Sequence, residues 1–139
     1  MNPRTTLKQV VLGAALLASA CSAAPAKPVP NDTVYWQELG SWSGRGNIQT
    51  ETFVGLTGSL RFHWKTASKD QAQTGTFRLI LGSGVSGRDL LTAVDTKGPG
   101  EGTSYAGEDP RLFYVLVESS DLDWWFTVEE AAFVSNNAD

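Results

Sequence analysis

Short segments in which apolar and polar residues alternate recur along most of this chain, with glycine-rich turns between them. The alternation is clearest at residues 59–65, where Leu60, Phe62 and Trp64 are separated by basic side chains. A period of two places successive side chains on opposite faces of a β-strand. The pattern predicts strands near residues 34–42, 48–54, 59–65, 76–82, 90–95, 102–106, 111–118 and 124–130.

Strands this short and this evenly spaced are typical of an all-β fold. We therefore expect a single antiparallel β-sandwich of about eight strands, with a jelly-roll or an immunoglobulin-like arrangement. The domain is expected to cover residues 33–139, with a last helical turn near residues 129–134.

The first twenty residues have the composition of an export signal. A positively charged start precedes an apolar segment over residues 10–20, which is shorter than the roughly 20 residues that a bilayer requires. The segment ends at Cys21 and resembles the bacterial lipobox, whose cysteine becomes lipidated. We expect a lipoprotein signal peptide over residues 1–20 and a lipid anchor on Cys21. Cleavage by an ordinary signal peptidase near Ala24 is the alternative, and it also exports the protein.

The segment after the cysteine is expected to be a tether. Residues 21–32 contain three prolines among small residues, which favours an extended, semi-rigid chain. Ser22 resembles the outer-membrane sorting pattern of Gram-negative bacteria, although the choice of membrane stays open. Cys21 is the only cysteine, so an intramolecular disulfide is excluded. The expected location is the periplasmic or cell-surface side of a bacterial membrane.

Charge excludes one class of partner. Without Arg4 and Lys8, which belong to the signal peptide, 9 of the 11 basic residues remain against 15 acidic ones, a balance of −6. No basic cluster is present that could follow a phosphate backbone, so nucleic acid is not an expected partner.

The chain also resembles known modules. Five segments carry the resemblance: Gly44-Arg45-Gly46, Thr50-Glu51-Thr52-Phe53, residues 60–64, Phe113-Tyr114 and residues 124–129. Together they resemble a β-sandwich module of uncharacterised bacterial lipoproteins, and the C-terminal half is similar to the bacterial pre-peptidase C-terminal domain. Such modules imply an accessory, non-catalytic role.

The sequence offers little for catalysis. His63 is the only histidine, alternates with Arg61 and Lys65, and is expected on a solvated face. No Gly-x-Ser-x-Gly segment occurs, and residues 82–87 match a dinucleotide fingerprint without the helix it needs, so we expect a loop there. We expect no enzyme and no cofactor.

Calcium is a secondary hypothesis. Calcium binds six to eight oxygen ligands, often from loops. Acidic residues do recur in the turns, but their spacing matches no EF-hand, so solvation of the turns is the simpler interpretation. The candidate ligands are Asp89, Asp95, Asp121 and Asp123.

Five tryptophans are many for one small domain. Trp64 and Trp124 share the inward face of their strands, whereas Trp125, next to Trp124, must point to the opposite side. Trp36 and Trp42 would share a face in a regular strand, although Gly40 could introduce a bulge. The candidate binding residues are Trp125 and, more weakly, Trp36, Tyr35 and Tyr105.

These observations predict a lipid-anchored envelope protein that works as a binding or structural module, with an envelope protein or polysaccharide as partner. One alternative is an inhibitor or accessory factor of an exported enzyme that uses the loop at residues 98–102. Another is a glycan-processing hydrolase with two carboxylates. The sequence leaves the oligomeric state open.

Overall fold

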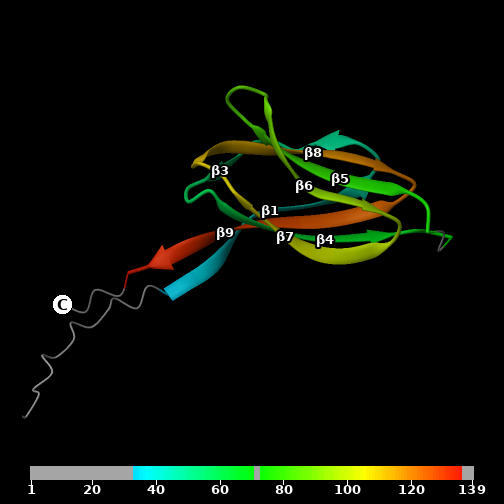
Figure 1. Cartoon of the computed structure of the whole chain (residues 1–139), viewed down its shortest axis with the longest axis horizontal. Helices are drawn as coiled ribbons and strands as arrows, with labels where there is room; N and C mark the ends of the chain where they lie inside the picture. The colour runs from blue at the N-terminus through cyan, green and yellow to red at the C-terminus, as the bar shows by residue number, and fades with distance from the viewer. Residues whose placement is uncertain (1–32, 71–72, 136–139) are drawn as a thin grey trace, which may run out of the picture.

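Two antiparallel sheets pack face to face in the computed structural model, which describes residues 33–70 and 73–135 (Figure 1). Sheet I has the strand order β1-β9-β4-β7, and sheet II has the order β2-β8-β5-β6, with β3 also paired to β8. The all-β sandwich that the alternation predicts is confirmed. The strands are β1 (Thr33–Arg45), β2 (Ile48–Gln49), β3 (Phe53–Gly55), β4 (Ser59–Ala67), β5 (Thr76–Ser83), β6 (Asp89–Lys97), β7 (Gly100–Gly107), β8 (Arg111–Ser120) and β9 (Asp123–Val134).

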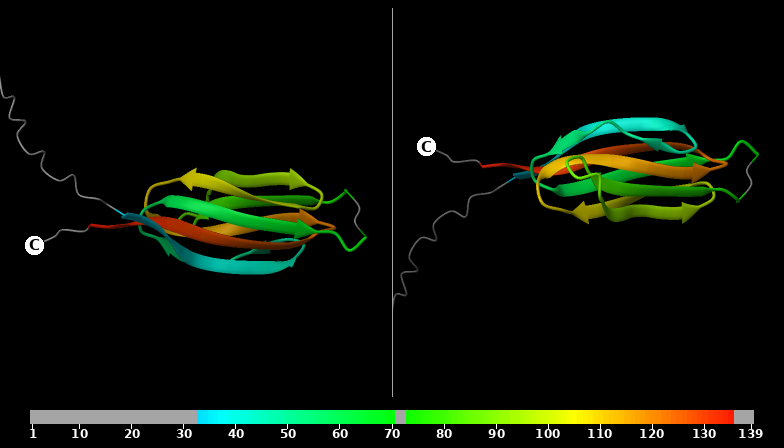
Figure 2. Two further views of the ribbon diagram at one scale, coloured as in Figure 1. Left: turned by 90° about the horizontal axis from the view of Figure 1, so that it is seen from below. Right: turned by 90° about the horizontal axis from the view of Figure 1, so that it is seen from above.

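The strand pairs are nested. β1 pairs with β9, β2 and β3 with β8, β4 with β7, and β5 with β6, always antiparallel. The chain is thus folded like one long hairpin whose two arms wind together into the two sheets (Figure 2). This is the jelly-roll arrangement of the two that the sequence allowed.

The strand predicted at residues 48–54 is divided into β2 and β3. Thr50, between them, still bonds β8: its N–H donates to the Val115 carbonyl at 2.9 Å, and its Oγ1 accepts from the Val115 N–H at 2.9 Å. Two residues then lie between Thr50 and Phe53, whereas one lies between their partners Val115 and Phe113. The extra residue interrupts the ladder as a β-bulge does.

The last helical turn expected near residues 129–134 is wrong. β9 runs without a break to Val134, and its last residues pair with the first residues of β1. Pairing with a neighbouring strand satisfies the backbone groups of this segment, and one isolated helical turn offers too few hydrogen bonds to compete. Among the residues that the structure describes, no helix is long and apolar enough to cross a membrane.

Aromatic rings form a continuous core between the sheets. Trp124 is fully buried, as predicted, and its ring lies 5.6 Å from that of Phe126 and 6.3 Å from that of Phe77. Its indole N–H donates to the Gly46 carbonyl at 3.0 Å, so burial leaves no unpaired polar atom on this ring. Trp64 packs against the same core and is partly buried.

One carboxyl group is buried beside this core. Glu130 is 1% exposed, and its Oε2 accepts hydrogen bonds from the backbone N–H groups of Leu56 and Thr57 at 2.8 and 3.2 Å. These two residues form the turn between β3 and β4. Glu130 therefore fastens a turn from sheet II to the central strand of sheet I, which nothing in the sequence pattern indicated.

We expect Glu130→Leu to destabilise the protein by about 2 kcal/mol, because the two turn N–H groups lose their acceptor. Glu130→Gln keeps a side-chain oxygen at the same position and is expected to cost less. Urea unfolding followed by tryptophan fluorescence measures both variants. Equal stability of Glu130→Leu and the parent protein would contradict this role.

Candidate functional site

The side of sheet I that faces away from the core carries aromatic rings beside charged groups. Directly paired residues on adjacent strands point to the same side of a sheet, so the strand register defines this surface. We call it the outer face. Its rows are Glu38, Glu129, Arg61 and Tyr105; then Ser41, Thr127, His63 and Thr103; then Ser43, Trp125, Lys65 and Glu101, with Trp36 opposite Ala131 beyond the first row.

A β-bulge in β1 decides which tryptophan reaches the outer face. The register shifts between Glu38 and Gly40, so the alternation of side chains reverses there. Trp36 lies on the outer face, whereas the ring of Trp42 stacks on the core residue Phe126 at 5.2 Å. Trp36 and Trp42 therefore do not share a face, because β1 is not regular and contains the bulge that Gly40 suggested.

Arg61 is the centre of the outer face. Its Nε donates to Glu129 Oε2 at 2.7 Å, and its Cζ lies 4.1 Å from the centre of the Trp36 ring. The Trp36 ring in turn lies 6.0 Å from that of Tyr105 at an angle of 59°. A guanidinium held by both a carboxylate and an aromatic face is fixed in position, and it fixes the ring beside it.

Glu129 joins Arg61 to the only histidine. His63 Nε2 lies 2.8 Å from Glu129 Oε2, and His63 Nδ1 lies 3.0 Å from Thr103 Oγ1. Burial raises the pKa of Glu129. The hydrogen bond and charge of Arg61, and then the charge and hydrogen bond of His63, lower the pKa by more than burial raises it, so the pKa lies below its ordinary value. Glu129 is thus held in its charged form. The solvated face expected for His63 is confirmed, since its side chain is 45% exposed, yet it has two partners.

Trp125 lies on the same face, two rows from Arg61. It is 45% exposed, which confirms that it points away from the core in which Trp124 is buried. Its register partners are Ser43 on β1 and Lys65 on β4. Along β9 it is four residues from Glu129, which corresponds to about 13 Å.

The structure brings three of the four candidate aromatic residues to the outer face. Trp36 and Tyr105 contact each other, and Trp125 lies farther along the same face. Tyr35 does not join them, because it precedes Trp36 in β1 and pairs with Ala132 on the opposite side.

Three site residues were not singled out for binding by the sequence: Arg61, His63 and Glu129. The first two were assigned to a solvated face from the alternation at residues 59–65, and that assignment holds. The ion pairs join residues 66 and 68 positions apart in the chain, so no local pattern shows them. Adjacent charged residues on two predicted strands are the only signal available.

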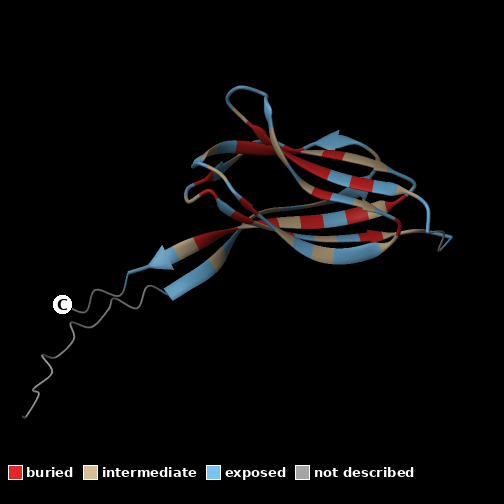
Figure 3. Ribbon diagram, viewed as in Figure 1, coloured by how far each residue is buried: buried red, intermediate tan, exposed pale blue. Residues whose placement is uncertain are grey.

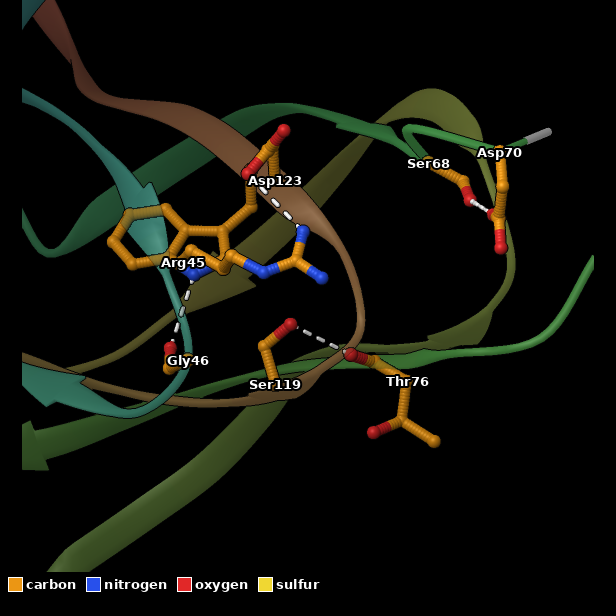
Figure 4. A network of polar contacts seen from close by, with 8 residues as sticks. Arg45, Gly46, Ser68, Asp70, Thr76, Ser119 and Asp123 are labelled. Atoms are coloured by element: carbon orange, nitrogen blue, oxygen red, sulfur yellow. Dashed lines mark hydrogen bonds and ion pairs between the residues drawn. The ribbon is translucent and has the colours of Figure 1, made fainter. Parts of the chain in front are cut away.

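The four candidate calcium ligands are dispersed. Asp123 pairs with Arg45 at 3.3 Å at the end of the sandwich shown in Figure 4, and Asp95 lies 3.6 Å from Arg78 on sheet II. Asp121 lies in the turn between β8 and β9, and Asp89 begins β6. No group of three acidic, histidine or cysteine side chains among residues 33–70 and 73–135 is placed to hold a metal ion. Cys21, the expected lipidation site, lies outside the described residues.

A shallow hollow adjoins the outer face at its β4–β7 side. It is lined by His63, Glu101 and Thr103 together with Trp64 and Gly102, and its volume is about 330 Å³. That volume is at the lower end of the range for small-molecule sites. The hollow can receive one group of a ligand that lies across the face.

The chain of contacts from Thr103 through His63 to Glu129 has the order of a nucleophile, a base and an acid. An imidazole with its proton on Nε2 donates to Glu129 and accepts the Thr103 hydroxyl proton on Nδ1. The Glu129 oxygen is shared with Arg61, however, and the three side chains lie on an open sheet face. Acyl transfer would also need hydrogen-bond donors aimed at an oxyanion.

Comparison of the chain with protein-family models, with curated proteins and with solved structures finds no match. The resemblance to lipoprotein modules and to the pre-peptidase C-terminal domain stays a prediction.

The lowered pKa of Glu129 predicts a pH dependence of stability. A carboxyl whose pKa is lower in the folded state than its ordinary value of 4.5 stabilises the protein above that pH, and the contribution is lost as the pH falls through the folded-state pKa. Glu129→Gln is thus expected to lower the melting temperature at neutral pH, with a difference from the parent that shrinks in acid. Thermal unfolding between neutral pH and pH 3 measures this difference.

Glu118→Gln is the matched control, because Glu118 also pairs with an arginine, Arg78, but both of these side chains are 44% exposed. An exposed ion pair contributes little to stability. If the melting temperatures of the parent and of Glu129→Gln differ by the same amount at every pH, the lowered pKa of Glu129 is contradicted.

Proposed function

We propose that this chain is a lipid-anchored bacterial envelope protein whose sandwich is a non-catalytic module that binds polysaccharide through the outer face. The observation that carries the proposal is the gathering of Trp36, Tyr105 and Trp125 on one face of one sheet. Tyr105 is 68% and Trp125 is 45% exposed. Aromatic rings left in water on one surface are unusual unless they serve a partner.

The chemistry of the face suits sugar rings. Aromatic side chains present rigid apolar area, against which the C–H groups of a sugar ring pack. Hydroxyl groups lie between the rings: Ser41 Oγ and Thr127 Oγ1 are 3.0 Å apart, and Thr103 borders the shallow hollow. Charged groups that bond sugar hydroxyls complete the surface, with Arg61 and Glu129 in its centre.

The face is organised before a ligand arrives. Trp36 is held by Arg61, and Arg61 is held by Glu129, on three adjacent strands. Groups that are already fixed lose little conformational entropy on binding, so more of the contact energy contributes to affinity.

The spacing of the rings indicates an extended ligand. Tyr105 and Trp125 are two strands and four residues apart in the register, which corresponds to about 16 Å. A single sugar cannot reach both rings. The substrate class that fits is an oligosaccharide or polysaccharide chain lying across the sheet.

The inhibitor alternative loses its proposed loop. Residues 98–102 were expected to form a loop that plugs a cleft, but Gly100 begins β7 and pairs with Thr66 of β4. Gly98 and Pro99 alone make the turn, and Gly98 adopts a left-handed φ of 72° there. The segment that joins β6 to β7 is thus a two-residue turn and not the longer loop on which that alternative was based.

Trp125→Ala and Tyr105→Ala are each expected to weaken retention on purified envelope glycans by about fivefold to tenfold, because each removes roughly 1 kcal/mol of ring contact. Affinity electrophoresis or a pull-down on insoluble glycan, with bound protein quantified, measures the effect.

Val54→Ala is the matched control, since Val54 is 53% exposed but lies on β3 of sheet II. It is expected to leave retention unchanged. Unchanged retention in both aromatic variants would refute the proposed face. If the aromatic variants instead lose binding to an envelope protein and keep their binding to glycan, the same face would be assigned to a protein partner.

The anchor has its own test. Cells that express the full chain with a radiolabelled fatty acid are expected to label the parent protein and not Cys21→Ser, because Cys21 is the only thiol in the chain. Gel autoradiography of the immunoprecipitated protein measures the label. An unlabelled parent protein would favour cleavage near Ala24 and release of the domain.

A further inference from the structure

The first residues of β1 and the last residues of β9 extend beyond the sandwich as a two-stranded ribbon (Figure 1). Thr33 pairs with Val134, Val34 with Phe133, and Tyr35 with Ala132. We call these six residues the ribbon tip. It lies at one end of the molecule, where the described part of the chain begins and where β9 ends.

The ribbon tip is largely exposed (Figure 3), and apolar side chains lie on both of its faces. Phe133 is 60% exposed and Val34 is 51% exposed on one side, while Tyr35 and Val134 are 45% and 44% exposed on the other. The tip contains no acidic or basic residue, in a chain in which 19% of residues are charged. Because four large apolar side chains are exposed together with no charged residue among them, moving this tip out of water is favourable.

The position of the tip in the chain indicates what it meets. Cys21 precedes Thr33 by 12 residues, and a fully extended segment of that length spans at most about 40 Å. A lipid on Cys21 therefore holds the domain close to a membrane by the strand that forms the tip. The expected charge balance of −6 disfavours contact between anionic lipids and the rest of the surface.

We infer that the ribbon tip inserts into the interfacial region of the membrane that carries the anchor, with Val34, Tyr35, Phe133 and Val134 as the inserted side chains. The inference rests on the lipid anchor of the proposed function. Aromatic side chains are enriched at the boundary between headgroups and hydrocarbon, and Tyr35 and Phe133 are placed to occupy it. Lipid and tip together then fix the domain at two points.

The test uses the chain from Cys21 to Asp139, since both sheets and the core lie within residues 33–135. Its only cysteine is coupled to a maleimide lipid in phosphatidylcholine vesicles, so the result does not depend on lipidation in cells. Quenching of tryptophan fluorescence by brominated phosphatidylcholine is measured. Trp36, directly after the tip, reports on insertion, and Trp36→Phe identifies its share of the quenching.

Val34→Ser combined with Phe133→Ser is expected to reduce the quenching by about twofold or more, because the inserted apolar area falls. Tyr35→Ser combined with Val134→Ser tests the other side of the ribbon and is expected to act in the same direction. The matched control is Val85→Ser combined with Ile48→Ser, which changes one exposed apolar residue in the β5–β6 turn and one in β2. Its fluorescence is expected to be quenched as much as that of the parent. Melting temperatures identify any variant that has lost its fold.

Equal quenching in the parent and in both tip variants would overturn the inference. Sedimentation of the uncoupled chain tests whether a second copy of the chain covers the tip instead. If the parent is a dimer, the tip variants are monomers and the parent shows no quenching in vesicles, the tip is a contact between two copies and the inference is overturned. Glycan retention is expected to be the same in the tip variants and the parent. Failure of the proposed glycan site would therefore be seen separately from failure of the proposed membrane contact. An unlabelled Cys21 in cells would remove the anchor on which the inference rests and would overturn it, whatever the quenching in vesicles.

Discussion

The register of β9 is the constraint on which both faces of sheet I depend. β9 lies between β1 and β4, and its side chains alternate between the core and the outer face. A slip of one residue would move Trp124 out of the core and Trp125 into it. The adjacent acids Glu129 and Glu130 have different roles for the same reason: Glu129 binds Arg61 on the outer face, and Glu130 binds turn amides in the interior.

Those parts of the fold that follow from period two were predictable from the sequence. The segment at residues 59–65 alternates strictly, and of its inward residues Leu60 and Phe62 are buried and Trp64 is partly buried. In β9 the residues expected to point inward, Trp124, Phe126 and Val128, are buried, whereas the burial of Glu130 was not expected. The same rule separated Trp124 from Trp125 without any knowledge of their neighbours. The jelly-roll order could not be chosen over the immunoglobulin-like order, because it depends on which strands pair, and strand pairing joins distant parts of the chain.

The site was predictable only in its exposed rings. Trp125, Trp36 and Tyr105 were candidates because they are aromatic residues on strands, and the strand register places them on one face. The bulge near Gly40 reverses the alternation of side chains along β1, and the sequence indicated it only by a glycine in a β segment. The contacts of Arg61 with Glu129 and Trp36 need three strands to be placed side by side, so they belong to the tertiary structure alone.

The proposed glycan site and the proposed membrane contact share the pair β1–β9. The pairing continues from Arg45 and Asp123, past the outer face, to Thr33 and Val134 at the tip. An antiparallel pair of this length resists bending when further strands support it, and β4 supports β9 along the outer face. A tip fixed in the membrane would therefore hold the outer face upright at a set height above the lipid. The line from Tyr105 to Trp125 covers about 13 Å along β9 and about 10 Å across two strands, so a chain bound to both rings would lie closer to the membrane normal than to the membrane plane.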